Sequence, residues 1–289
     1  MMKFNKKILK FSRVILILAT LCLSGCYGAY EAERAYWLVN RKYARFIKEF
    51  EAADEVGRER LISNRSKEII VDFRKMIISY PGWPPSAQAQ LMIAGIYNTR
   101  NETERAISEY QRVLKEYPAL NKQCASAVYA IAVIYQQEGS WPEAEENFKR
   151  VMKEYFYTNT GLRVPLPFSR SLRARGRFEA AEDVYGEAIS KYTTYISENP
   201  DELNVLLALE QLINCYGDQN RWQEAVDFLD NKINKGPDTP LVLQSLAISA
   251  TIYETHLDNK EKAYKIYRRV VEKFPDSPAA KNIKERLNL

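Results

Sequence analysis

The sequence predicts an all-α protein: a right-handed superhelical solenoid of about six antiparallel helix pairs, closed by a capping helix at the C-terminus. A small residue, an aromatic residue four positions later and a proline a further eight positions on recur along the chain, as in Ala106, Tyr110 and Pro118. Tyrosines recur nine residues before the small residue, and no alternating strand pattern competes. Recurrence of this kind indicates a repeat architecture.

The N-terminus has the pattern of a secretory signal peptide over residues 1–25. Residues 1–13 carry five basic side chains and no acidic one, and an apolar run follows from Val14 to Leu23. That run is shorter than the roughly 20 residues needed to span a bilayer. A cleaved signal peptide is therefore favoured over the alternative, an uncleaved membrane anchor.

The segment Leu23-Ser24-Gly25-Cys26 resembles the lipobox of bacterial lipoproteins. The resemblance implies that Cys26 is acylated and becomes the first residue of the mature chain. Several acyl chains anchor a protein stably, whereas one chain binds only marginally. Because Tyr27 is not the aspartate that retains lipoproteins in the inner membrane, we expect secretion across the inner membrane and anchoring at the periplasmic face of the outer membrane.

The charge balance changes once the signal peptide is set aside. The chain has 42 Lys and Arg against 37 Asp and Glu, and removal of the five basic residues of the signal leaves 37 against 37. A neutral mature chain does not indicate nucleic-acid binding. The two remaining cysteines, Cys124 and Cys215, form no disulfide or metal pattern and are expected to be small buried hydrophobes.

The mature chain divides into an N-terminal helix pair (26–84) and a repeat array (85–289). The pair is predicted as helices at 29–53 and 58–79. The array is predicted as helices at 85–98, 103–116, 122–137, 142–155, 168–175, 177–198, 201–217, 222–234, 240–256 and 260–273, with a capping helix at 277–287. Left-handed residues are expected at the turns inside the pairs, at Asn101, Gly139, Gly176 and Asn220.

The repeat resembles the tetratricopeptide repeat, which has a small residue, then Tyr, then Ala-x3-Phe, then Pro. The alanine-aromatic spacing recurs at Ala144 and Ala263, among others, although successive alanines lie 37 to 44 residues apart instead of about 34. The resemblance implies that each pair has a first (A) helix and a second (B) helix, which approach closely at the alanine. Neighbouring pairs must then stack, because one hairpin cannot bury its apolar face alone.

One unit, at 157–200, departs from the repeat. Pro165 and Pro167 are expected to shorten its A helix, and its B helix is longer than the others. No acidic residue lies between Glu154 and Glu179, whereas five arginines do: Arg163, Arg170, Arg173, Arg175 and Arg177. Two interpretations stay open, a degenerate repeat with solvated arginines and a contact site for an anionic partner.

The A helices of such stacks form a concave face that suits protein segments. By register the predicted face includes Gln88, Asn98, Tyr129, Gln136, Asn214 and Glu254, together with Leu91, Val133, Glu210, Gln244 and Thr251. Asn and Gln side chains can bond a peptide backbone in either sense. The predicted partners are therefore envelope proteins.

Catalysis has little support in the sequence. A single histidine, His256, builds no nucleophilic triad and no zinc site, and the glycines form no phosphate-binding loop. We expect His256 to be a surface or turn residue. The sequence predicts no enzyme, no cofactor and no metal site.

The lipobox followed by repeats resembles the repeat lipoprotein subunit of the outer-membrane β-barrel assembly machinery. The turn from Phe274 to Ala280 is also similar to the turns that end repeats in that group. The resemblance implies a scaffold in outer-membrane protein assembly. Two alternatives remain open: a lipoprotein that helps assemble pili or secretin rings, and an adaptor that recruits peptidoglycan enzymes.

Overall fold

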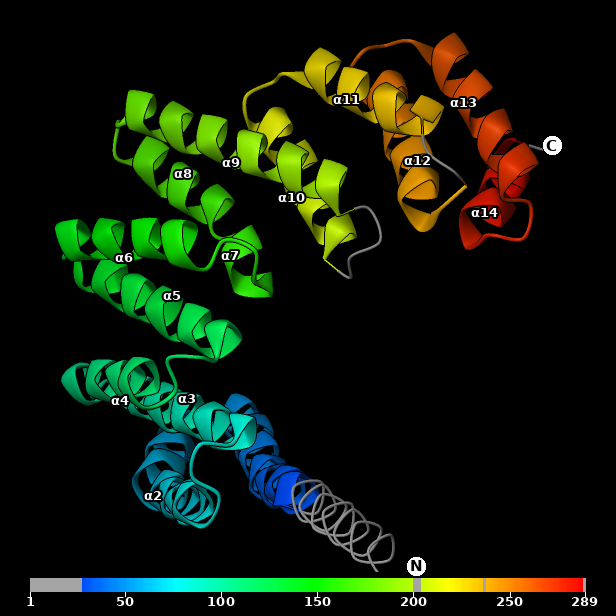
Figure 1. The fold of residues 1–289 in the computed structure, drawn as a ribbon. Coiled ribbons are helices and arrows are strands. Elements are labelled where there is room, and N and C mark those ends of the chain that lie inside the picture. Colours follow the sequence, from blue (N-terminus) through cyan, green and yellow to red (C-terminus); the bar gives the residue numbers. More distant parts are fainter. Residues whose placement is uncertain (1–27, 200–203, 236–237, 288–289) are drawn as a thin grey trace, which may run out of the picture. The chain divides into compact units, whose positions relative to one another are not determined.

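The computed structural model describes residues 28–199, 204–235 and 238–287, and it divides into two compact units, Met1–Thr158 and Asn159–Leu289. We refer to these as unit 1 and unit 2. The described residues contain helices and turns and no strand (Figure 1). The predicted all-α repeat fold of antiparallel helix pairs is therefore confirmed. The predicted signal peptide and Cys26 lie outside the described residues.

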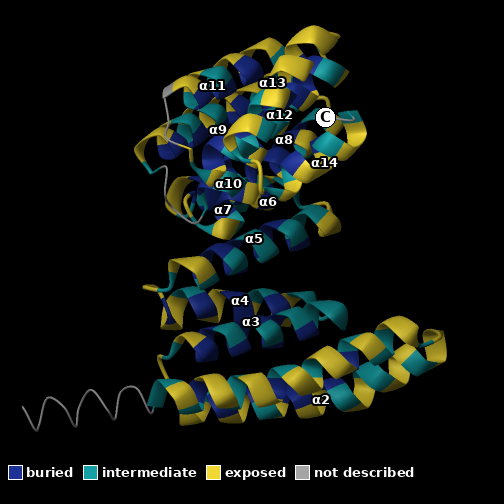
Figure 2. Cartoon of the chain, turned by 90° about the vertical axis from the view of Figure 1, so that its right-hand side faces the viewer, coloured by how far each residue is buried: buried dark blue, intermediate teal, exposed yellow. Residues whose placement is uncertain are grey.

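Unit 1 opens with a helix described over residues 28–52, here called the N-terminal helix. It continues with α2 (Glu55–Ser79), α3 (Pro84–Thr99), α4 (Thr103–Glu116), α5 (Asn121–Glu138) and α6 (Trp141–Glu154). The A and B helices of the repeats are α3 with α4 and α5 with α6. Exposed residues lie on the outer sides of these helices, and buried residues face the neighbouring helices (Figure 2).

Unit 2 begins with the short α7 (Asn159–Arg163) and contains three pairs and a final helix. The pairs are α8 (Pro165–Ala174) with α9 (Phe178–Glu198), α10 (Val205–Asp218) with α11 (Trp222–Lys235), and α12 (Pro240–Thr255) with α13 (Lys260–Lys273). The final helix is α14 (Pro278–Leu287), where the sequence predicts a cap. None of the described helices is both long enough and apolar enough to cross a membrane.

The turns inside the pairs have the predicted left-handed backbone. Asn101, Gly139, Gly176 and Asn220 have φ angles of 55°, 80°, 73° and 56°. Glycine adopts this region without steric cost and asparagine tolerates it, so the chain can reverse directly after the A helix. The amide of the next residue then bonds a carbonyl of the last helical turn, as Ser140 N does to Tyr135 O at 2.9 Å.

The alanine-aromatic pattern forms the contact between helices. The alanines predicted at the crossings are fully buried, with at most 1% of their surface exposed, at Ala106, Ala144, Ala225 and Ala263. The aromatic side chains four residues later are buried as well, at Tyr110, Phe148 and Tyr267. A methyl side chain at the crossing lets the two backbones approach, and the following ring fills the space beside it. This part of the prediction is confirmed.

The A helix of the irregular unit is short, as predicted: α8 has 10 residues, whereas α3, α5, α10 and α12 have 14 to 18. Its start differs from the prediction, because Pro165 is the first helical residue and Pro167 lies in the same turn, so α8 begins three residues earlier than predicted. The backbone N–H groups in the first turn of a helix have no acceptor within the helix, so proline, which lacks an N–H, is favoured there. The helix α7 was not predicted from the sequence. The prediction of a long B helix is confirmed, since α9 has 21 residues whereas α4, α6, α11 and α13 have 14 each.

Both cysteines within the described residues are buried free thiols. Cys124 lies in α5 and Cys215 in α10. Burial raises the pKa of the Cys215 thiol to about 12, so this side chain stays protonated and packs as a small apolar group.

Candidate functional site

The predicted face of unit 1 is formed by the A helices α3 and α5, and its side chains are half-buried. Gln88 interacts with the phenol of Tyr36 on the N-terminal helix. The ring of Tyr129 lies 6.1 Å from that of Phe148 on α6. The face therefore combines polar groups with side chains that already support the packing of the unit.

The other predicted face residues of unit 1 differ in how exposed they are to a partner. Asn98 and Gln136 are half-buried near the C-terminal ends of α3 and α5, and Val133 is half-buried three residues before Gln136 on α5. Leu91 is only 6% exposed and belongs to the core between the two repeats. The surface that a partner can reach is thus narrower than the sequence predicts, because position 91 points into the interior.

In unit 2 the predicted residue Glu254 has an intramolecular role. Its Oε2 accepts a hydrogen bond from the Tyr267 hydroxyl at 2.6 Å. The same oxygen forms an ion pair with Arg286 Nη2 at 3.2 Å. The Arg286 guanidinium also lies 4.5 Å from the Tyr267 ring centroid. Glu254 therefore joins α12 to α13 and to the terminal helix α14.

An apolar pocket of about 320 Å³ opens on the A-helix side of unit 2. It lies between α10, the start of α11 and α12. The lining residues are Ile213, Trp222, Ala247, Ile248, Thr251, Ile252 and His256. Five of the seven have apolar side chains. Exposed Asn214, a predicted face residue, follows Ile213 directly, and predicted Thr251 is itself part of the lining.

One wall of this pocket is the indole of Trp222. The His256 ring stacks on it with centroids 3.7 Å apart and planes 12° apart. Gly217 leaves room for the indole, because a Cβ added there would lie 2.6 Å from Trp222 Cη2. The wall is thus fixed by α10 and by the end of α12 before any partner arrives.

Neither Trp222 nor His256 is among the site residues predicted from the sequence. His256 was expected at the surface or in a turn, and it is exposed at the C-cap of α12. A signal for the tryptophan does exist in the sequence: Trp141 and Trp222 each lie three residues before the alanine of a B helix. Each tryptophan is the first residue of its B helix, α6 or α11. Their recurrence therefore marks the turn between the A and B helices of a repeat.

The arginine-rich unit is neutralised in part by acids from other helices. Arg170 makes a two-point ion pair with Asp218 of α10, with Nε and Nη2 at 2.7 and 2.9 Å from its carboxylate oxygens. Arg173 donates to the Asp218 carbonyl at 2.7 Å and pairs with Glu182 at 2.5 Å. The absence of acids from this stretch of the sequence therefore does not leave Arg170 and Arg173 without acidic partners.

Asp218 is the centre of this cluster. Its Oδ2 also accepts a hydrogen bond from the buried Tyr185 hydroxyl at 2.8 Å. Burial acts to raise the pKa of the Asp218 carboxyl, but the bonds from Arg170 and Tyr185 and the charge of Arg173 outweigh it, so the pKa lies below its usual value. The cluster therefore holds α8, α9 and α10 together.

The other three arginines of the window lie on the surface. Arg163 is exposed on α7 and bonds Asn159 Oδ1 at 3.3 Å. Arg175 and Arg177 are exposed on either side of the turn at Gly176. Arg170 and Arg173 have acidic partners within the chain, so exposed Arg175 is the position at which the anion-contact hypothesis is tested below.

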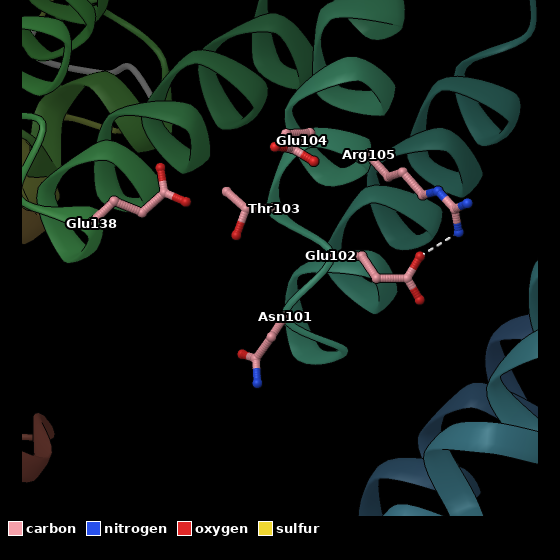
Figure 3. A pocket seen from close by; sticks show the side chains of 6 residues that line it. All are labelled: Asn101, Glu102, Thr103, Glu104, Arg105 and Glu138. Atoms are coloured by element: carbon pink, nitrogen blue, oxygen red, sulfur yellow. Dashed lines mark hydrogen bonds and ion pairs between the residues drawn. The ribbon is translucent and has the colours of Figure 1, made fainter.

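A second hollow, of about 550 Å³, lies in unit 1 at the turn between α3 and α4 and the end of α5 (Figure 3). All its lining side chains are polar or charged: Asn101, Glu102, Thr103, Glu104, Arg105 and Glu138. Burial acts to raise the Glu102 pKa, but hydrogen bonds from Arg105 and Arg100 outweigh it and lower the pKa. The Glu102 carboxylate thus has its hydrogen-bond partners within the chain. The hollow also has no apolar side chain in its lining, so it does not suit an apolar anchor residue of a partner.

Comparison with known proteins identifies the repeat. Residues 88–119 and 248–277 match the tetratricopeptide-repeat family model. These stretches cover most of the α3–α4 and α12–α13 pairs. No curated protein matches the chain in sequence. The family match and the helix pairs support a repeat protein of the tetratricopeptide type.

Solved structures with a similar arrangement include pilF of Pseudomonas aeruginosa (14% identity, TM-score 0.39, covering 90% of this chain and 99% of that one). BtubC from P. vanneervenii is similar at 15% identity and a TM-score of 0.45, covering 80% and 92%. A tetratricopeptide repeat protein from Parabacteroides merdae is similar at 16% identity and a TM-score of 0.34, covering 89% and 98%. At these values the likenesses concern the fold alone.

Proposed function

We propose that this repeat protein is a membrane-anchored scaffold lipoprotein that binds segments of partner proteins in the cell envelope. The observation that carries the proposal is the apolar pocket beside Trp222 on the A-helix side of unit 2. A scaffold of this kind holds partners together and needs no chemistry of its own, in keeping with the general role of tetratricopeptide repeats as interaction modules.

The size of the pocket favours one anchor side chain of a longer segment. Its volume of about 320 Å³ is at the lower end of the range of about 300–1,000 Å³ that holds drug-sized ligands. An apolar side chain buried among Ile213, Ile248 and Trp222 would act as the central contact of the interface. Exposed Asn214 and Thr251 lie beside it and can bond the backbone of the bound segment.

The proposed location and pathway rest on sequence resemblance. The lipobox ending at Cys26 supports acylation and an outer-membrane site. The layout of a lipobox followed by helix pairs supports outer-membrane protein assembly as the pathway, whereas the turn Phe274–Ala280 is common to a broad group of repeat proteins. Mass spectrometry of the membrane fraction tests the first point, because Cys26→Ser should leave an unprocessed and non-acylated precursor. A mature wild-type chain with an unmodified Cys26 still joined to residues 24–25 would refute the lipoprotein assignment.

Site-specific photocrosslinking tests the binding proposal. A photoreactive residue replaces Asn214 beside the pocket, and a matched control carries it at Asp227, an exposed position on α11. The Asn214 variant should capture envelope proteins that the Asp227 variant does not. Adding Ile248→Glu, which places a charge in the pocket lining, should abolish that capture while the melting temperature of the chain stays near that of the parent.

The comparison of the two positions distinguishes binding at the pocket from nonspecific crosslinking. Identical capture at both positions, or capture that survives Ile248→Glu, would remove the pocket as the binding site. Identification of the captured proteins then decides the pathway. Barrel-assembly components would support the proposal, and components of pilus, secretin or peptidoglycan systems would replace it with one of the alternatives.

A further inference from the structure

The N-terminal helix has two faces of different character. Its inner face packs into the core of unit 1 through Ala32, Val39 and Phe46, which are at most 9% exposed. The Tyr36 ring on the same side lies 6.2 Å from Phe73 of α2. The helix is therefore held on the body of the unit, and its opposite face is presented outward as a fixed surface.

The outer face combines large apolar side chains with basic ones. Tyr30, Trp37 and Leu38 are 62%, 56% and 49% exposed. Four basic residues are exposed with them: Arg34, which also forms an ion pair with Glu31, and Arg41, Arg45 and Lys48. Exposed Lys42 of the same helix pairs with Asp72 of α2 and is not counted with them. Two exposed acids, Glu33 and Glu51, leave this face with a net charge of four minus two, or +2. We refer to the seven apolar and basic residues as the outer face.

The spacing places these side chains in neighbouring columns along the helix. Tyr30 and Trp37 are seven residues apart, and so are Arg34, Arg41 and Lys48 in turn. Seven residues make nearly two full turns, so each column runs along one side of the helix. The Arg41 guanidinium lies 5.6 Å from the Trp37 ring centroid. Aromatic and basic groups are thus interleaved on a single surface.

We propose that the outer face lies flat on the surface of a bilayer that contains anionic phospholipids. Exposed Trp, Tyr and Leu beside Lys and Arg is the composition of helix surfaces that lie in the membrane interface. Indole and phenol rings favour the headgroup level. The basic side chains supply the charge that is complementary to lipid phosphates.

Chain geometry brings this face to the membrane. Tyr30 lies four residues after Cys26, so even a fully extended chain keeps it within about 14 Å of an acyl anchor there. The outer face runs from Tyr30 to Lys48, or about 27 Å at 1.5 Å per residue. All its basic groups reach headgroups together only if the helix lies parallel to the membrane. The location rests on the proposed lipid anchor, but the binding does not need it.

Vesicle flotation of a non-acylated chain tests the inference. The protein starts at residue 26 with Cys26→Ser, which keeps every described residue. Vesicles of phosphatidylethanolamine and phosphatidylglycerol are compared with vesicles of phosphatidylcholine. The chain should float with the anionic vesicles and stay behind with the neutral ones. Brominated lipids should quench part of its tryptophan emission.

Three variants locate the interaction. The basic variant carries R34Q, R41Q, R45Q and K48Q. The apolar variant carries Y30S, W37S and L38S. The matched control removes four exposed charges from unit 2 with K260Q, K265Q, R268Q and K281Q. Each charge removed from the outer face should weaken partition about fivefold, and the apolar variant should lose the quenching. The control should bind nearly as well as the parent.

Failure of the parent chain to float with anionic vesicles would overturn the inference. Equal loss in the basic variant and the control would also overturn it, because binding would then follow total charge and not the outer face. Melting curves confirm that each variant is folded. None of these outcomes bears on crosslinking at Asn214 or on the acylation of Cys26, so failure of this inference and failure of the proposed function are distinguishable.

Discussion

Gly217→Ala should disturb the wall of the apolar pocket. The new Cβ would lie 2.6 Å from Trp222 Cη2 and 3.2 Å from Cζ2, closer than two carbon atoms can pack. The indole cannot move freely aside, because the His256 ring is stacked on it at 3.7 Å. Either the indole leaves His256 or α10 shifts, and both changes deform the pocket.

Two opposing effects set the expected change in the free energy of unfolding. Overpacking in a filled site costs about 1–3 kcal/mol. Alanine is favoured over glycine inside a helix by about 0.5–1 kcal/mol. The net expectation is a loss of about 0–2.5 kcal/mol in the free energy of unfolding. Gly186→Ala in α9 is the matched control, since nothing lies within 4 Å of its added Cβ. It should gain about 0.5–1 kcal/mol.

The assay is urea denaturation of the two variants, followed by near-ultraviolet circular dichroism of the folded proteins. The difference between their unfolding free energies, about 1–3 kcal/mol, isolates the clash from helix propensity. The Gly217 variant should also change the tryptophan signal and weaken crosslinking from Asn214. Equal stabilisation of both variants, with an unchanged tryptophan signal, would show that Gly217 does not position Trp222.

Three further predictions concern the core, the acid response and the arginine surface. Phe148→Ala should lower the free energy of unfolding by about 3–5 kcal/mol, because the ring is 1% exposed; a thermal melt near that of the parent would place the repeat register in error. Asp218 has a lowered pKa, so its stabilising effect is complete above the unfolded pKa of about 4 and is lost as pH falls through the lowered folded value. Asp218→Asn should therefore destabilise the chain at neutral pH and flatten the stability loss below about pH 4, and unfolding curves of identical acid slope would contradict this. Arg175→Gln should change stability by no more than about 0.5 kcal/mol and weaken capture of an acidic partner at low salt but not at high salt; unchanged capture at low salt would favour a solvated surface.

The spacing of small and aromatic residues was enough to predict the helix pairs. Ala106 and Ala144 mark helix crossings because only a small side chain fits there, and that constraint acts between helices close in sequence. The left-handed turns at Gly139 and Gly176 follow from equally local backbone requirements. These features could be read from the sequence because each depends on neighbours within one repeat.

The start of α8 could not be read from composition alone. Proline breaks a helix in its interior and favours the first turn, and Pro165 and Pro167 fit either rule until the true first residue is known. The short α7 was missed for a related reason. Its position is fixed by a distant contact, in which the Tyr192 hydroxyl of α9 donates to the Leu162 carbonyl.

The candidate site was harder to predict because its parts meet only after packing. Asp218 lies 48 residues from Arg170, so a window scanned for acids along the chain could not find it. Trp222 and His256 are 34 residues apart, and their stacking depends on how α11 and α12 dock. The predicted face position Thr251 still lines the pocket, and Asn214 directly follows the lining residue Ile213, because both follow the A-helix register.

The long helix α9 contains the alanine-tyrosine signature twice. Ala181 and Tyr185 are followed seven residues later by Ala188 and Tyr192, and all four side chains are fully buried. Seven residues advance a helix by about 10 Å and return it to within about 20° of its starting angle. The two pairs therefore face the same side of α9 but bond different neighbours: Tyr185 donates to Asp218 of α10, and Tyr192 donates to the Leu162 carbonyl of α7. A deletion of seven residues would keep the remaining pair on the buried face, whereas a deletion of one or two would turn the rest of α9 by about 100–200°.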